Sequence, residues 1–503
     1  MATAPAPNPS TPSAEQAAMA PYYRMVDTVL AGADAVIAAG KDWLPQFPQE
    51  SDDDYNYRRR TAKFSNIYGD VVSGLAAKPF AEQVTLKEDG SSQELLDLAE
   101  DIDGRGNNLH VMASEVFFAG LNYEIDWILV DYTKGALPAN GRALSVAEER
   151  AQNLRPYWVR IPAGRMIAAY PALIGGDVAY VHVRFSEDVV ERQGYAEVVK
   201  ERIREFNREP LPDGGYAPAT WTLWEKQKDK RGNDVWVKID GGSVSIGEIP
   251  LTPFMTGKRN GSGQRIPPMK DALTLQKELY QQETSLKYAR EMSAFPMLAG
   301  NGVAPAIEKG KVVPVPVGPK SVLYAPPTGD TGKHGEWKFI EPSAESLKFL
   351  ADECKRTEQQ IRELGRQPLT AQSGNLTVVT TAFAAQKGNS AVQAWALNLK
   401  DALEQAFRFT AMWLKDKTSK PSVYVYTDFD VSMGDDIAPE ILKDMRANGD
   451  ISGVTYRAEA KRRGVLSADF NETEELARLA TEGPRPAPSN DPAGNPPAPA
   501  VAA

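Results

Sequence analysis

Residues 268–364 constrain the fold more strongly than any other part of the chain. They begin with a helical pattern over 268–294, whose apolar side chains fall on one side. Residues 295–342 then alternate Val-rich stretches with Pro and Gly, which indicates small edge strands and turns. Residues 343–364 return to helix. A compact β insert between two helices predicts a stalk that carries a tip.

The second helix of this pair carries a narrow apolar seam with charged flanks. The seam steps by three and four residues through Leu347, Leu350, Cys354, Thr357, Ile361 and Leu364. Such a seam suits helices that pack side by side. Cys354 is the only cysteine of the chain, so an intrachain disulfide and a Cys-rich metal site are excluded. We expect it to act as a small apolar side chain in a reducing compartment.

A still longer helix follows over 390–414. Its apolar stripe is typical of a helix that faces a core and runs through Val392, Trp395, Leu399, Ala402, Ala406, Phe409 and Trp413. The preceding KGNS places Gly388 in a helical context, and Ser390 with Gln393 forms a capping-box pair. We therefore predict that the helix begins afresh at Ser390 and bends near Gly388, which lowers helix stability by about 1 kcal/mol relative to Ala.

The rest of the chain mixes helices and strands, so the predicted fold class is α+β. Helical patterns cover 16–85 and about 93–118, and a strand follows in NYEIDWILVDY. Residues 156–256 are mostly short strands, interrupted by a predicted helix in YAEVVKERIREFN. SVYVYTDFDV is strand-like, and 437–480 is helical.

Composition excludes several classes of protein. The 503 residues are 42% hydrophobic, enough for a sizeable core, yet no run reaches the roughly 18 apolar residues that span a bilayer. Residues 1–15 lack the basic and apolar regions of a signal peptide. The net charge of −10 argues against tight general binding of nucleic acid. We expect no membrane association and no secretion.

The sequence offers little chemistry for catalysis. Its three histidines are far apart, and GDTGKH fails as a phosphate loop because Pro327 stands where the first Gly is needed. Asp428 and Asp430 could hold a divalent ion in a nuclease, but a solvent-facing strand explains them more simply. We therefore expect no enzyme activity, no metal and no cofactor.

Several stretches together, in their order along the chain, resemble the portal proteins of tailed bacteriophages over about residues 20–480. They are YNYRRRTAKFSNIYGDVVSGLAAKPF, GLNYEIDWILVDY, RPYWVRIPAGRMIAA, IPLTPFMTG, REMSAFPMLAGNGV, GNSAVQAWALNLKDALEQAF and NGDISGVTYRAEAKRRGVL. One departure is VVTTAFAAQKG, which lacks the acidic residue that many relatives carry at the start of the long helix.

The resemblance implies a ring, usually of twelve subunits in this family, at one capsid vertex of the virion, assembled in the host bacterial cytoplasm. Its parts would be disordered tails over 1–15 and 483–503, a wing over 16–267, stem helices over 268–294 and 343–364, a clip over 295–342, a tunnel loop over 365–376, a kinked spine helix with a return strand of the wing over 377–436, and a helical crown over 437–482.

Such a ring would conduct DNA during packaging and ejection. The implied partners are further copies of the chain, the large terminase subunit, a head-tail adaptor, capsid and scaffold proteins, and double-stranded DNA without sequence specificity. Twelve copies at −10 give about −120, which disfavours adhesion of DNA to the channel. Two alternatives stay open: another structural protein of the phage head or neck, and a metal-dependent nuclease.

Three sets of residues follow from the implied parts. The tunnel loop offers DNA-channel contacts, or merely solvated side chains, at Arg366, Gln367, Thr370, Gln372 and Asn375. The clip offers terminase or adaptor docking at Val312, Val313, Val315, Val317, Lys320 and Tyr324. The stem and spine offer subunit packing at Leu347, Leu350, Ile361, Trp395 and Leu399.

Overall fold

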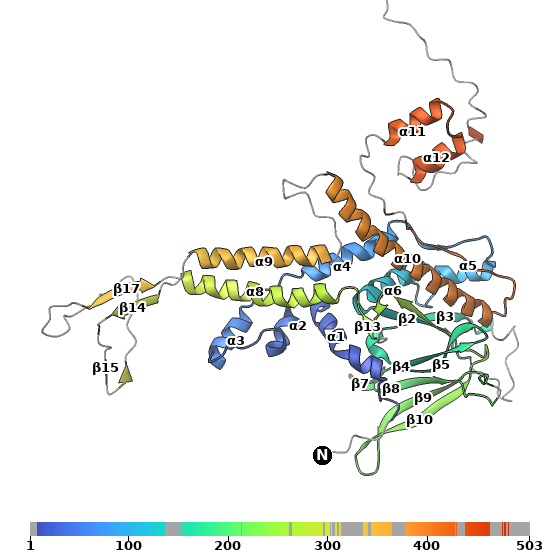
Figure 1. The fold of residues 1–503 in the computed structure, drawn as a ribbon. Coiled ribbons are helices and arrows are strands. Elements are labelled where there is room, and N and C mark those ends of the chain that lie inside the picture. Colours follow the sequence, from blue (N-terminus) through green and yellow to red (C-terminus); the bar gives the residue numbers. More distant parts are fainter. Residues whose placement is uncertain are drawn as a thin grey trace, which may run out of the picture. The chain divides into compact units, whose positions relative to one another are not determined.

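The computed structural model divides into two compact units, residues 1–429 and 430–503 (Figure 1). It describes residues 8–135, 148, 151–152, 154–212, 214–260, 264–294, 297–301, 303, 307–308, 311–312, 335–340, 344–364, 378–427, 429, 438–462, 475, 477–478 and 481. The first unit is a mixed α+β fold with antiparallel sheets, as the sequence predicts. No helix within these described residues is long and apolar enough to cross a membrane.

Six helices and two 3-10 turns open the first unit. The helices are α1 (Ala14–Leu30), α2 (Ala33–Ala38), α3 (Asp52–Arg60), α4 (Ile67–Ala77), α5 (Gln93–Glu100) and α6 (Leu109–Tyr123), with turns at Gly40–Asp42 and Lys78–Phe80. The single helix predicted over about 93–118 is wrong. Gly104 and Gly106 break it with φ angles of +73° and +94°, a conformation that other residues rarely adopt.

Residues 8–13, predicted to belong to a disordered tail, are instead attached to the fold. Arg184 Nη1 donates to the Pro9 carbonyl at 2.9 Å, and the Ser13 N–H donates to the Ile167 carbonyl at 2.9 Å. The Ser13 hydroxyl then caps α1 by accepting from the Gln16 N–H. Composition misled the prediction because these bonds use backbone groups, which every sequence carries.

A three-stranded antiparallel sheet lies at the centre of the core, in the order β11-β2-β3. Its strands are β2 (Ile125–Tyr132), β3 (Pro156–Ile161) and β11 (Leu251–Met255). Helix α6 packs against it through Phe117, which stacks on Phe254 with ring centroids 5.6 Å apart. A Cβ atom on Gly120 would come within 2.3 Å of the Phe254 ring, so this glycine permits the close approach of helix and sheet.

A five-stranded antiparallel sheet follows, in the order β10-β9-β8-β5-β4, with a short 3-10 turn at Ala163–Arg165 before it. Its strands are β4 (Met166–Ile174), β5 (Asp177–Ser186), β8 (Arg202–Asn207), β9 (Thr220–Lys228) and β10 (Asp234–Ser243). The hairpin β6 (Val189–Gln193) and β7 (Ala196–Lys200) branches from it. The helix predicted in 195–207 is therefore wrong, because β8 pairs with β5 and β9 on its two sides.

Two short ladders complete the body. β1 (Thr85–Leu86) pairs with β18 (Val423–Tyr424), and β12 (Lys258–Arg259) pairs with β13 (Arg265–Ile266). Of the strand expected over SVYVYTDFDV, the described residues 422–427 and 429 contain only the two residues of β18, and the other three residues lie outside the described part of the chain.

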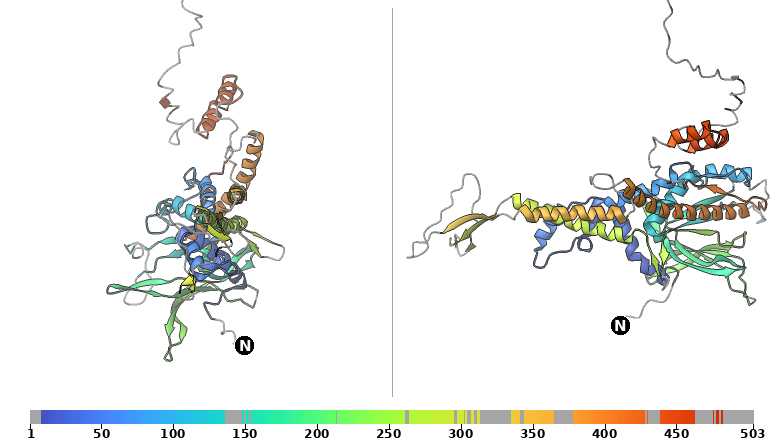
Figure 2. Two further views of the ribbon diagram at one scale, coloured as in Figure 1. Left: turned by 90° about the vertical axis from the view of Figure 1, so that its left-hand side faces the viewer. Right: turned by 45° about the horizontal axis from the view of Figure 1, so that its top comes forward.

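Two long helices, α8 (Lys270–Ala294) and α9 (Ala344–Leu364), lie side by side and extend away from the sheets (Figures 1 and 2). They correspond to the helices predicted over 268–294 and 343–364. Between them, β14 (Met297–Asn301) pairs with β17 (Glu336–Ile340), and β15 (Ile307–Glu308) pairs with β16 (Lys311–Val312). A β-hairpin therefore stands at the far end of the helix pair.

The long helix α10 (Val378–Trp413) is continuous through Gly388. The predicted new start at Ser390 is wrong, since one glycine costs only about 1 kcal/mol and does not by itself end a helix of this length. The predicted apolar stripe is buried as expected, with Val392 and Leu399 both inaccessible to solvent. Trp158 of β3 fixes α10 to the sheet by donating from Nε1 to Thr410 Oγ1 at 2.9 Å.

The second unit contains two described helices, α11 (Ala438–Ala447) and α12 (Gly453–Arg462), within the part predicted to be helical. The Ser452 hydroxyl caps α12 by accepting from the Thr455 N–H at 3.1 Å.

Candidate functional site

The base of the α8/α9 pair is held to the body by a buried carboxylate. Glu283 of α8 accepts hydrogen bonds from the Ser65 N–H at 3.0 Å and the Ser65 hydroxyl at 2.8 Å. It also forms an ion pair with Lys63 Nζ at 2.7 Å. Since its side chain is only 9% exposed, these contacts compensate for the loss of water around the charge.

Gln276 precedes Glu283 by seven residues, about two turns on the same face of α8, and makes a second attachment. Its fully buried amide accepts from the Tyr68 N–H at 2.9 Å and donates to the Ser65 carbonyl at 2.8 Å. Arg362 of α9 forms an ion pair with Asp70 of α4 at 2.8 Å. Both helices of the pair are thus fixed to the segment around α4.

The predicted seam of α9 faces the chain's own helices. Thr357 and Ile361 are buried, and the Thr357 hydroxyl bonds the Gln282 side-chain oxygen of α8 at 2.9 Å. Leu347 and Leu350 are half-buried on the same face. The buried part of the seam, Thr357 and Ile361, therefore packs α9 onto α8 and α4 within one chain. The packing between subunits predicted for Leu347 and Leu350 stays a prediction.

Three of the five residues predicted to pack between subunits are interior. Ile361 and Leu399 are inaccessible to solvent, and Trp395 is 8% exposed. They belong to the core that α10 and the sheets share. A side chain with no exposed surface cannot contact another subunit, so Ile361 and Leu399 stabilise the chain itself, and Trp395 does so with nearly all of its surface.

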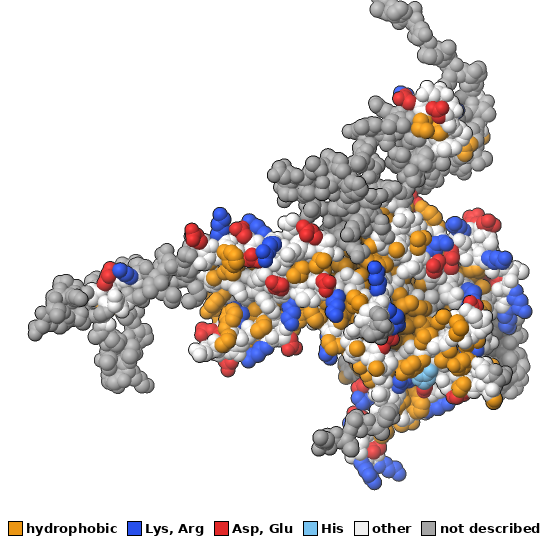
Figure 3. All heavy atoms as spheres, in the orientation of Figure 1, with side chains coloured by type: hydrophobic (Ala, Val, Ile, Leu, Met, Phe, Trp, Pro, Cys, Tyr) orange, Lys and Arg blue, Asp and Glu red, His pale blue; other side chains and the backbone are white. Residues whose placement is uncertain are grey.

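A groove of about 740 Å³ runs beside the α8/α9 pair. Its lining combines apolar and charged side chains, namely Lys63, Glu283, Leu286, Lys287, Arg290, Glu291, Leu347 and Cys354. Burial raises the pKa of the Cys354 thiol, as expected for a small apolar side chain. The seam predicted from sequence thus contributes its outer part, Leu347 and Cys354, to an accessible surface. Figure 3 shows such apolar side chains between charged ones along this part of the molecule.

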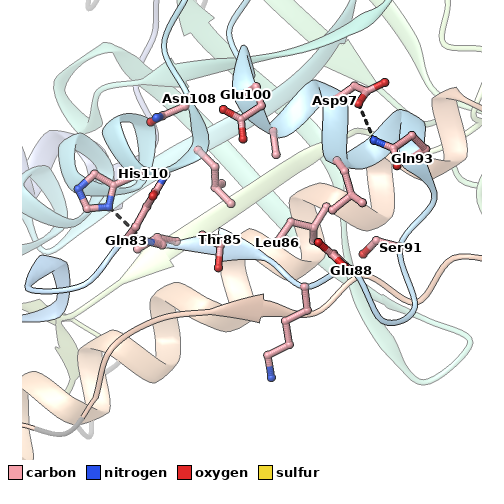
Figure 4. Close-up of a pocket in the computed structure, with 15 residues that line it drawn as sticks. Gln83, Thr85, Leu86, Glu88, Ser91, Gln93, Asp97, Glu100, Asn108 and His110 are labelled. Atoms are coloured by element: carbon pink, nitrogen blue, oxygen red, sulfur yellow. Dashed lines mark hydrogen bonds between the residues drawn. The ribbon is translucent and has the colours of Figure 1, made fainter. Parts of the chain in front are cut away.

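A second cavity, of about 970 Å³, lies beside β1 and α5 (Figure 4). His110 of α6 accepts from the Val84 N–H through Nδ1 at 3.1 Å, in keeping with the structural role predicted for the histidines. The Lys87 N–H donates to the Ser422 carbonyl at 2.9 Å. Because peptide groups alternate in direction along a strand, the peptide group of Leu86 points away from β18. Sequence patterns gave no signal for this open strand edge.

Three carboxylates contribute to the lining of this cavity. Glu88, Asp97 and Glu100 line it, and Asp97 accepts from the Gln93 side chain at 2.8 Å. Figure 4 places His110 and Ser91 at opposite ends, so the lining does not pair a hydroxyl with a base.

Two buried acid–base pairs stabilise the start of β2. Asp126 is inaccessible to solvent and pairs with Arg160 at 2.5 Å, and Glu124 pairs with Arg265 at 2.7 Å. Burial raises the pKa of each carboxyl to about 7, although the arginine partners act in the opposite direction.

The other predicted site residues lie mostly outside the described part of the chain. This holds for all five tunnel-loop residues and for Val313, Val315, Val317, Lys320 and Tyr324 of the clip. Val312 is the last residue of β16. Asp428 and Asp430 of the nuclease alternative also lie outside. Among the residues that the structure describes, no three His, Cys, Asp or Glu side chains are grouped so as to hold a metal.

Comparison with known proteins gives a partial match. Residues 268–414, which include the α8/α9 pair and α10, match a family described as "Domain of unknown function (DUF4055)". No curated protein matches the chain.

Two solved structures are similar to this chain at low identity. They are chains of the "Neck of native GTA particle computed with C12 symmetry" and the "Neck of empty GTA particle computed with C6 symmetry", each 12% identical with a TM-score of 0.38. The alignments cover 89% and 90% of this chain and 99% of those chains. With both TM-scores below 0.5, the proposals below depend on the chain's own geometry.

Proposed function

We propose that this chain is a portal protein, which forms a ring at one capsid vertex and serves as the conduit for DNA during packaging and ejection. The observation that carries the proposal is the α8/α9 pair, fixed at its base by Glu283 and Gln276 and bearing the β14/β17 hairpin at its far end. The sequence resemblance to portal proteins assigns this element to the stem and clip.

Physical arguments support an assembly role for this element. The exposed surface of the pair carries many charged side chains and an open groove of about 740 Å³, which suits contact with another protein. Within the described residues the β14/β17 hairpin has two strands, and an isolated two-stranded hairpin is marginally stable in water. Strand edges at such a tip can pair with those of a neighbour or a docking partner.

The proposal includes the partners that the resemblance implies. The clip would dock the large terminase and then a head-tail adaptor, through residues such as Val312 and Val315. The tunnel loop, including Arg366 and Gln367, would face passing DNA. The subunit would reside in the virion and act without catalysis or cofactor.

Electron microscopy of the purified protein tests the ring. We expect closed rings with a central opening, with about twelve subunits. A monodisperse monomer at micromolar concentration, even with capsid components present, would contradict the proposal and favour another structural protein of the head or neck.

Deletion of residues 305–330 tests the docking surface. We expect terminase binding, measured by co-sedimentation with the rings, to be lost while the rings remain closed. Unchanged terminase binding by the deletion variant would refute the assignment of the clip.

A further inference from the structure

Phe349 is the most exposed large apolar side chain among the described residues of α9. Phe349 is 63% exposed, and the residues around it are mostly polar. It is two positions from Leu347, which is about 200° around the helix, so it projects from the face opposite the groove. The stem thus presents an aromatic side chain on one side and an apolar groove on the other.

The two features are at the same height along the stem. The bond between Thr357 and Gln282 sets the alignment of α9 with α8. The two helices run in opposite directions, so residue numbers toward the tip fall along α9 and rise along α8. Eight residues toward the tip from Thr357 is Phe349, and eight residues toward the tip from Gln282 is Arg290. Arg290 lines the groove. Subunits related by rotation alone keep equal heights, so Phe349 of one subunit meets the groove level of the next.

Charges around the two features are complementary. Glu345 and Asp352 stand four residues before and three residues after Phe349, on the same face of α9. The groove carries Lys287 and Arg290 beside Glu291, and among the described residues neither cation has an ion-pair partner. Asp352 is 4.0 Å from Lys355 Nζ on its own helix, and both side chains of that pair are exposed. By the same alignment, Asp352 and Lys287 share one height.

From these observations we propose that Phe349 inserts into the groove between α8 and α9 of a second copy of this chain, lined by Leu286, Leu347 and Cys354. Asp352 and Glu345 of the first copy face Lys287 and Arg290 of the second. The contact is heterologous, because it joins two different surfaces, and repetition of such a contact generates a ring when the rotation closes. The inference rests on the proposed ring and names the contact that builds its stem.

Cross-linking tests the contact directly. In a Cys354→Ser background, one variant carries Phe349→Cys and a second, distinguished by a tag, carries Arg290→Cys. We expect the two variants, produced together and oxidised, to form a mixed disulfide dimer. A disulfide needs Cα atoms less than about 7 Å apart, so its formation would show that the two positions lie close together in neighbouring copies. Each variant alone is the control and should remain uncross-linked.

The outcomes separate this inference from the portal proposal. Closed rings without a mixed dimer, or a Phe349→Cys variant that links to itself, would overturn the contact and leave the ring intact as a proposal. Absence of both rings and cross-links would overturn both. Mixed dimers within open chains would support the contact and refute the closed ring.

Substitutions measure the contribution of the contact. Phe349→Ala should weaken assembly by about tenfold or more, as for a buried aromatic anchor, whereas Gln359→Ala, ten residues further along α9 and also exposed, should have little effect. Lys287→Glu and Asp352→Lys should each reduce ring formation, and their combination should restore it. Equal assembly of Phe349→Ala and the unmodified chain, or no restoration by the double exchange, would contradict the inference.

Discussion

Asp126 shows how one residue can couple the stability of the body to pH. Its carboxyl is inaccessible to solvent beside Arg160, and burial raises its pKa to about 7. In the unfolded chain an aspartate titrates near pH 3.9. The folded state therefore binds this proton more tightly, so the stabilisation is complete at low pH and is lost as pH rises toward 7.

We predict that Asp126→Asn flattens the pH dependence of stability. For the unmodified chain, the free energy of unfolding should fall by about 1–3 kcal/mol between pH 5 and pH 8 because of this group. The variant should show a smaller fall, measured by chemical denaturation at both pH values.

Asp229→Asn provides the control for this measurement. Hydrogen bonds from the Asn233 backbone lower the pKa of Asp229, so it stays ionised from pH 5 to pH 8 in either state. Its substitution should leave the slope unchanged. A slope in Asp126→Asn as steep as that of the unmodified chain would refute the assignment.

Single residues also show where sequence reasoning fails. The pairing of Asp126 with Arg160 joins residues 34 apart in sequence, and no local pattern announces it. By contrast, the structural role of His110 was predictable, because no metal ligand or carboxylate stood at a suitable spacing in the sequence.

At the scale of the element, Glu283 decides how firmly the stem is attached. Glu283→Ala would remove the acceptor of the Ser65 N–H and hydroxyl and leave Lys63 without its partner. We expect a loss of about 1–3 kcal/mol in the free energy of unfolding.

Glu278→Ala on the same helix is the matched control. Glu278 is exposed and accepts only from the Gln282 side chain, one turn away, so its loss should cost less than about 0.5 kcal/mol. Both costs can be measured by chemical denaturation. Equal losses for the two substitutions would show that the buried contacts of Glu283 contribute no more to the free energy of unfolding than the exposed hydrogen bond of Glu278.

Long helices with a regular apolar period were predictable from the sequence, whereas strands that depend on pairing with distant segments were not. The helices α8 and α9 and the buried stripe of α10 have the expected positions. The segment 195–207 has a helical composition, yet its second half forms β8, which pairs with β5 on one side and β9 on the other. Tertiary context overrides local propensity there.

For the whole molecule, the division into two units has a testable consequence. A chain that ends at Phe429 retains every element from α1 to β18. We predict that its thermal unfolding midpoint stays within a few degrees of that of the full chain. A large decrease would show that residues 430–503 stabilise the first unit.

Sequence reasoning at this scale predicted the two helices of the stalk but misjudged part of one surface. The α9 seam was expected to face neighbouring subunits, yet Thr357 and Ile361 are buried within the chain, whereas the seam residues nearer the tip stay partly exposed. Periodicity identifies which face of a helix is apolar, but it does not identify what covers that face. Phe349 lies outside the seam, so helical periodicity did not predict its exposed position.

The two-stranded ladder of β1 and β18 is blocked on one side and open on the other. On the β18 side, Glu404 of α10 accepts from the Val423 N–H at 2.9 Å and so occupies the edge. On the β1 side, His110 occupies only the Val84 N–H, and the Leu86 peptide group faces the acidic cavity. An extended peptide can therefore lengthen this sheet from one direction only, so edge pairing through β1 ends at a single partner and cannot continue through β18.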